Sequence, residues 1–167
     1  DFKKLDNLNG HYIRATPDAV LEAEAVAFLA QQNPPRVLSD KARARLLAAM
    51  PSLKERAKTL AELVQGADFL YTDGIRDLDE AAAKLLTPEA RAGLGQTLPV
   101  LDATDWTAPA LEEAARKHAE NSGQKLGQVA QPLRAALTGK ASSPPLFEML
   151  ALLGREESLI RLRAYAA

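Results

Sequence analysis

Signals that start and end helices recur along the whole chain, and they constrain its fold more than any other feature. At three places a Ser or Thr hydroxyl, which can cap free amides, stands directly before a proline, which has no N–H to leave unsatisfied in a first helical turn. The three pairs are Thr16-Pro17, Thr87-Pro88 and Ser143-Pro144. Glycines such as Gly139 and Gly154 follow helical patterns and predict helix ends. No run alternates apolar and polar residues for long enough to indicate a sheet, so the sequence predicts an all-α protein.

The same signals divide the chain into a series of expected helices. They are predicted at residues 17–30, 40–50, 52–65, 78–86, 88–101, 108–122, 127–138, 144–153 and 155–166. Ser39 is expected to cap the second helix, and Pro51 is expected to separate it from the third. Aromatic residues make up only 5% of the chain, so the core is expected to consist mainly of Leu and Ala, which favour helices.

A turn-rich stretch at 68–74 predicts a boundary between two small helical subdomains. We expect a short N-terminal remnant of another region at 1–14, a first subdomain at 15–68 and a second at 69–167. No stretch approaches the ~18 apolar residues of a membrane span. The chain has no cysteine and shows no signal peptide, so we expect a soluble, cytoplasmic protein without contact to a membrane.

The net charge of −1 hides a pattern along the chain. Residues 36–58 hold seven basic and two acidic side chains, residues 59–113 hold three and eleven, and residues 114–167 hold eight and four. Two basic segments therefore flank an acidic one. Clustered positive charge is typical of proteins that bind polyanions, but solvated helix faces explain the same pattern.

No catalytic or metal-binding site is predicted. His11 and His118 have no ligand partner at helical spacing, and Gly93-Leu94-Gly95 lacks the lysine and the preceding strand of a phosphate loop.

Basic residues near position 56 are candidates for contacts to RNA. On a helix over 52–65, Leu53 and Leu60 lie three residues before and four residues after Arg56, so Arg56 is expected on or beside an apolar arc. A guanidinium there needs a partner for its five donors, although it could also only cover the core. Lys54 and Lys58 are expected together on the opposite, solvated face.

The segment 125–149 combines polar groups with a stiff turn. Gln131 and Arg134 are spaced to lie on one side of a helix, and Ser143, Pro144 and Leu146 follow in the next turn. Hydroxyls, free amides and an Arg fork can bind base edges, and small apolar groups can pack against an unstacked base. Two packed helices with a capped turn would give the same pattern.

Three stretches resemble the C-terminal part of bacterial-type glutamyl-tRNA synthetases. They are KLDNLNGHYIR near the N-terminus, LKERAKTLAELVQGADFLYTD from residue 53, and KLGQVAQPLRAALTGK followed by SPPLFEMLALLGREESLIRLR from residue 125. The resemblance covers nearly the whole chain in the right order. It implies an all-α anticodon-binding region of the helical cage type found in this class I enzyme, joined in the parent protein to a remnant of the stem-contact region.

The resemblance also implies roles for individual residues. Arg56 falls where the family contacts the third anticodon base, the base that separates glutamate from glutamine tRNAs. Four further residues fall on the positions that surround the first two anticodon bases in the family. They are Arg134, Ser143, Pro144 and Leu146. Pro145 replaces the glycine that usually follows Pro144. Lys54 and Lys58 are expected to contact phosphates.

The implied partner is the anticodon arm of glutamate tRNA, together with the catalytic domain of the same parent chain. That domain would use ATP and Mg²⁺ for ligation, whereas this chain, without the class I motifs, is expected to bind no cofactor and to be inactive alone as a monomer. Two alternatives stay open: an α-helical protein-interaction module that does not bind RNA, and a related enzyme that charges a different tRNA.

Overall fold

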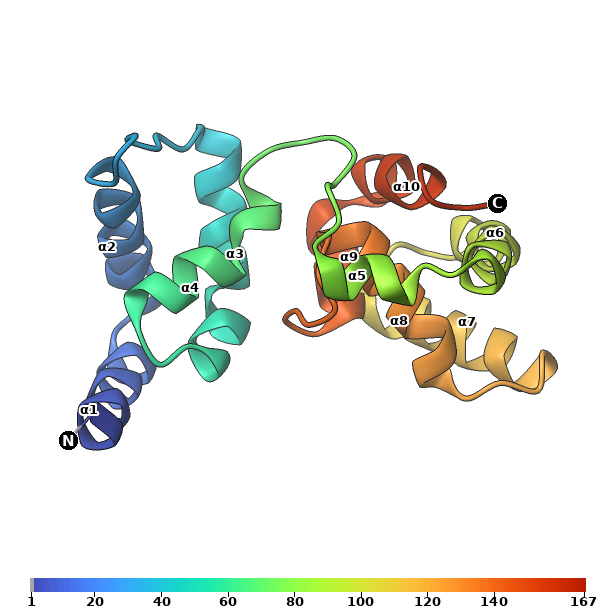
Figure 1. The fold of residues 1–167 in the computed structure, drawn as a ribbon, viewed down its shortest axis with the longest axis horizontal. Coiled ribbons are helices and arrows are strands. Elements are labelled where there is room, and N and C mark those ends of the chain that lie inside the picture. Colours follow the sequence, from blue (N-terminus) through green and yellow to red (C-terminus); the bar gives the residue numbers. More distant parts are fainter. Residues whose placement is uncertain (1) are drawn as a thin grey trace. The chain divides into compact units, whose positions relative to one another are not determined.

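The computed structural model describes the backbone of residues 2–167 and the side chains of residues 9–167. This part of the chain contains ten α-helices, one 3-10 turn and no strand, so the all-α prediction is confirmed (Figure 1). The chain divides into two compact units between Thr72 and Asp73. The predicted boundaries at 14/15 and 68/69 rest on composition and resemblance, and they stay predictions.

The first unit consists of four helices and the 3-10 turn. They are α1 (Phe2–Ala15), α2 (Asp18–Ala30), α3 (Asp40–Arg56), α4 (Leu60–Gly66) and η1 (Asp68–Leu70). α3 contacts each of the other four elements, and its buried face joins side chains of α2 and α4 in an aliphatic core. Leu21, Leu46, Met50 and Leu63 are almost completely buried there.

The predicted helix break at Pro51 is wrong, because α3 continues through this proline to Arg56. Leu46, Met50 and Leu53 form one buried stripe that spans Pro51, and their packing outweighs the loss of a single backbone hydrogen bond. The break comes instead at Ala57, whose backbone is extended. Thr59 then caps α4 by accepting a hydrogen bond from the amide of Glu62, 3.1 Å away.

The beginning of α2 also differs from the expectation. Pro17, not Thr16, precedes the first helical residue, and no side chain caps this end. The buried hydroxyl of Thr16 instead donates to the carbonyl oxygen of Tyr12 at 2.6 Å and closes the end of α1. α1 contains residues 2–14 of the expected N-terminal remnant, and it packs against α3.

The second unit is built around one central helix. Its elements are α5 (Glu80–Leu85), α6 (Pro88–Asp102), α7 (Ala108–Asn121), α8 (Leu126–Thr138), α9 (Leu146–Leu153) and α10 (Arg155–Arg163). α8 packs against all five of the others (Figure 1). Leu133, Ala136 and Leu137 are completely buried, so the core lies along α8 and fixes the direction in which its remaining face points.

The turn after α8 begins at Gly139, which adopts a left-handed conformation with φ of 76°. Glycine reaches this region without the steric penalty of a Cβ. α9 begins at Leu146, two residues later than predicted, and Ser143 does not cap it. Pro144 and Pro145 therefore belong to the connecting turn between α8 and α9.

Candidate nucleic-acid interface

The side chains of Arg134 and Ser143 meet at the turn between α8 and α9. Nε of Arg134 donates a hydrogen bond to Oγ of Ser143 at 3.0 Å. The same hydroxyl donates to the carbonyl oxygen of Pro144 at 2.7 Å. Ser143 and Pro144 are buried and Arg134 is half-buried, so these bonds hold the guanidinium and the turn in one arrangement. The structure thus brings together three of the residues that the sequence singled out.

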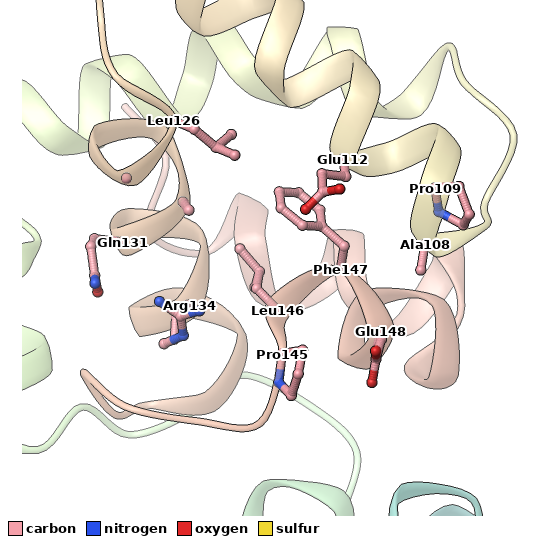
Figure 2. A pocket seen from close by; sticks show the side chains of 12 residues that line it. Ala108, Pro109, Glu112, Leu126, Gln131, Arg134, Pro145, Leu146, Phe147 and Glu148 are labelled. Carbon is pink, nitrogen blue, oxygen red and sulfur yellow. The ribbon is translucent and has the colours of Figure 1, made fainter. Parts of the chain in front are cut away.

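A pocket of about 570 Å³ lies beside this turn, between α7, α8 and α9 (Figure 2). Arg134 and Leu146 both line it, and Figure 2 shows Leu126 and Phe147 reaching into the space between the helices. The walls are mostly apolar, with polar groups at a few points. The lining residues are Ala108, Pro109, Glu112, Leu126, Gly127, Ala130, Gln131, Arg134, Pro145, Leu146, Phe147 and Glu148. An apolar pocket with a few polar groups suits a flat aromatic ligand such as a base.

Leu146 contributes less to this surface than the sequence suggests. Its side chain is only 3% exposed, because it is the first residue of α9 and packs into the core. Pro145 is the exposed member of the proline pair, whereas Pro144 is buried. The apolar contacts that the turn offers to a ligand therefore come from Pro145 and Phe147 more than from Pro144.

Gln131 is a polar residue of this pocket. Its spacing from Arg134 places both on one side of a helix, but it is not among the expected site residues. It lies one turn before Arg134 on α8. Within the part of the chain that the structure describes, its Oε1 atom is buried and has no hydrogen-bond partner. Buried carbonyl oxygens are normally satisfied, so this atom marks a place where a donor is missing.

In the first unit, Arg56 is the last residue of α3 and its side chain is exposed. The predicted apolar arc is wrong in part. Leu53 lies on the same helix and is buried, but Leu60 belongs to α4, beyond the break at Ala57. Arg56 therefore projects from a helix end and not from the middle of an apolar face.

Lys54 and Lys58 do not share a solvated face. The ammonium of Lys54 lies 2.7 Å from Oδ1 of Asp18 and donates to the carbonyl oxygen of Thr16 at 2.6 Å. The Lys54 side chain is only 13% exposed, so it ties the end of α3 to the start of α2. Lys58 stands beyond the end of α3 and is exposed.

Other basic residues of the 36–58 segment also have partners inside the first unit. Arg43 binds both carboxylate oxygens of Glu22, at 2.8 and 3.2 Å, and this hydrogen bonding, with the charge of Glu22, raises the pKa of Arg43. Arg45 is buried and donates to the carbonyl oxygen of Leu70. The guanidinium of Arg36 lies 4.9 Å from the centre of the Tyr71 ring. Much of the positive charge in this segment therefore stabilises the unit itself.

Among the helices that the structure describes, none is both long enough and apolar enough to cross a membrane.

The family model described as an anticodon binding domain matches residues 20–166. The chain belongs to this anticodon-binding domain family. The match includes α8, the turn with Ser143 and the pocket beside it, and it also includes Arg56 at the end of α3.

Two curated relatives of this anticodon-binding domain are named glutamate–tRNA ligases. The chain is 56% identical to glutamate–tRNA ligase 1 of Methylobacterium sp. (strain 4-46), with 99% of this chain and 36% of that protein covered. It is 52% identical to glutamate–tRNA ligase 2 of Brucella ovis, with 97% and 35% covered. The predicted resemblance to glutamyl-tRNA synthetases is thereby confirmed, and the chain spans about a third of the length of these relatives.

Solved structures share the fold of this anticodon-binding domain. A glutamate tRNA ligase from Elizabethkingia meningosepticum CCUG26117, in complex with its amino acid, matches with a TM-score of 0.76 at 23% identity, over 96% of this chain and 31% of that chain. The synthetase from Elizabethkingia anophelis matches with a TM-score of 0.73 at 22% identity, over 96% and 30%.

Proposed function

We propose that this chain recognises the anticodon of glutamate tRNA as part of a glutamate–tRNA ligase. The observation that carries the proposal is the hydrogen bond between Arg134 and Ser143 beside an apolar pocket, in a chain of the anticodon-binding domain family. A guanidinium held in place can present its fork to base edges, and the pocket can receive an unstacked base. Arg134 and Ser143 supply the polar groups of the subsite for the first two anticodon bases. Pro144 and Leu146 shape the subsite from their buried positions, and Pro145 and Phe147 supply its exposed apolar contacts.

Arg56 reads the third anticodon base in this proposal. An arginine can donate to the carbonyl oxygen and ring nitrogen of cytosine, but it cannot accept the ring N–H of guanine. Its place at an exposed helix end is compatible with a base contact. Lys58 contacts phosphates, whereas Lys54 contributes mainly by holding α2 and α3 together, because its ammonium is bound to Asp18.

The parent enzyme joins glutamate to this tRNA in the cytoplasm and acts as a monomer. ATP and Mg²⁺ are bound by its class I catalytic domain, since the motifs for ATP chemistry are absent from the present sequence. This chain supplies recognition only and holds no cofactor.

Binding of the isolated chain to glutamate tRNA at two salt concentrations tests the proposal. We expect binding that weakens as salt rises, because neutralised phosphates release counterions. A helical protein-interaction module would bind this tRNA no better than an unrelated RNA of equal length, and such a result would overturn the proposal.

A further inference from the structure

The second unit begins with a short segment, residues 74–79, which we call the strap. The strap lies against the carboxyl end of α8. The amide of Asp79 donates to the carbonyl oxygen of Gly139 at 2.9 Å. A Cβ atom added at Gly139 would overlap the carbonyl oxygen of Asp77 and touch the side chain of Arg76. The strap and the first residue of the turn after α8 are therefore in direct backbone contact.

A buried ion pair fixes the start of the strap and the last turn of α8 at the same time. Oε1 of Glu157 accepts a hydrogen bond from the amide of Gly74 at 2.6 Å and lies 3.3 Å from Nε of Arg161. Nη1 of Arg161 donates to the carbonyl oxygen of Leu137 at 2.9 Å. Arg161 is completely buried, so this connection is shielded from water and from salt.

The middle of the strap is held by Tyr165. Its hydroxyl donates to the carbonyl oxygen of Arg76, and its ring packs against a small cluster that contains Leu86 and Ala135. Ala135 stands next to Arg134 on α8. The strap is thus attached at its beginning, middle and end to the helix that carries Arg134.

The turn after α8 starts at this point of attachment. Oγ1 of Thr138 donates to the carbonyl oxygen of Arg134 at 2.8 Å and accepts from the amide of Lys140 at 3.2 Å. The chain then reaches Ser143, which holds the guanidinium of Arg134. Any shift of Gly139 would move the base of this turn relative to α8.

We propose that the strap is a positioning element for base recognition: it holds Gly139 so that Ser143 meets Arg134. Glu157, Arg161 and Tyr165 are positioning residues that act through the strap and touch no RNA themselves. The role in recognition rests on the proposed function, whereas the mechanical part concerns the free protein.

Two glycine substitutions provide a matched test. Gly139 and Gly123 both follow a helix and both have positive φ, 76° and 68°. An added Cβ at Gly139 meets the strap, but at Gly123 nothing lies within 4 Å. Gly139→Ala and Gly123→Ala therefore share the backbone strain, and only the first displaces the strap.

Amide hydrogen exchange of the free protein is the first readout. In Gly139→Ala we expect the amides at 74–79, at 140–143 and at 146 to exchange about tenfold faster than in Gly123→Ala, because lost contacts lower the local opening free energy. Equal exchange of these segments in the two variants would overturn the proposal. If Gly139→Ala fails to fold, Tyr165→Phe decides, since it keeps the ring and removes only the bond to Arg76. Faster exchange of both segments supports the strap, and unchanged exchange overturns it.

Binding of tRNA variants is the second readout. Gly139→Ala should lose discrimination at the first two anticodon positions and keep discrimination at the third, whereas Gly123→Ala should keep all three. Equal loss at all three positions would make the strap a general structural support and overturn its positioning role. Wild-type protein that binds no tRNA would overturn only the proposed function, because the exchange experiment still judges the strap.

Discussion

Arg134 and Ser143 are joined by a hydrogen bond of 3.0 Å from Nε to Oγ, which links α8 to the turn that follows it. A guanidinium that is bound at Nε has a fixed plane. Because the side chain is already ordered in the free protein, less conformational entropy is lost when a ligand binds to it. The relationship makes Ser143 a support for Arg134 as well as a candidate contact.

Removing either partner of this pair should weaken recognition of the first two anticodon bases. Arg134→Ala is expected to lose about 1–3 kcal/mol of tRNA binding, the range for a good bidentate base contact. Ser143→Ala should lose less, and the double variant should lose less than the sum of the two, since they share one interaction. The wild type, the two single variants and the double variant form a double-mutant cycle, which titrations with labelled tRNA measure. Circular dichroism is the control for folding. Strict additivity would show that Ser143 does not orient Arg134.

Arg56→Gln should reduce discrimination at the third anticodon base. Glutamine offers both a donor and an acceptor, so it can bind cytosine or guanine, whereas Arg56→Lys lacks the planar fork and should not restore the preference. Stability should change little because the side chain is exposed. The measurement compares the affinities for glutamate and glutamine tRNAs. An unchanged ratio in Arg56→Gln would leave Arg56 without a role in base selection.

We expect Lys54 to contribute to stability and Lys58 to contribute to electrostatic binding of tRNA. Lys54→Gln breaks the ion pair with Asp18 and is expected to destabilise the first unit by about 1–3 kcal/mol. Lys58→Gln should leave stability nearly unchanged. It should reduce the slope of the logarithm of the tRNA-binding constant against the logarithm of the salt concentration by about one. Urea unfolding and binding at several salt concentrations provide the two measurements. Equal effects of both substitutions on stability would contradict this division.

The first unit should lose stability at alkaline pH through Tyr71. Burial, the largest cause, raises the pKa of Tyr71 in the folded protein. The folded state therefore binds the phenolic proton more tightly than the unfolded state does. The stability that this provides is complete below the unfolded pKa of about 10 and is lost as pH rises above it.

Tyr71→Phe tests this pH dependence. It removes the titrating group along with the hydrogen bond to the carbonyl oxygen of Val64, so stability should be lower at neutral pH and flatter above about pH 10. Tyr12→Phe is the control. The pKa of Tyr12 is also raised, but by its hydrogen bond to Glu24, and the side chain is exposed, so this substitution tests a tyrosine that is not shifted mainly by burial. Urea unfolding followed by circular dichroism measures both. A wild-type protein whose stability does not fall in this range would contradict the assignment.

Sequence patterns predicted most helices of the second unit because their signals are local. A threonine hydroxyl caps α6 and another caps α7, and Gly139 ends α8, as expected from residue types alone. Pro51 shows where such signals fail. The stripe of Leu46, Met50 and Leu53 depends on partners from α2 and α4, and this tertiary packing overrides a local helix breaker.

The sequence singled out Arg134 and Ser143 as candidates, and the structure places them in contact, but the packing around them could not be predicted. The spacing of Arg134 and Ser143 could suggest proximity, whereas the orphaned oxygen of Gln131 and the burial of Leu146 follow only from the packing of α9 on α8. Lys54 looked solvated because sequence spacing cannot show that Asp18 begins the neighbouring helix beside it.

The most direct test of anticodon recognition uses the isolated chain and four forms of glutamate tRNA. One form carries the natural anticodon, and each of the others carries a single substitution at one of its three bases. We expect the natural form to bind most tightly and each substitution to weaken binding by about 1–3 kcal/mol. Arg134→Ala should abolish the differences at the first two positions and preserve the difference at the third. Equal affinity of the wild-type chain for all four forms would show that it does not read the anticodon.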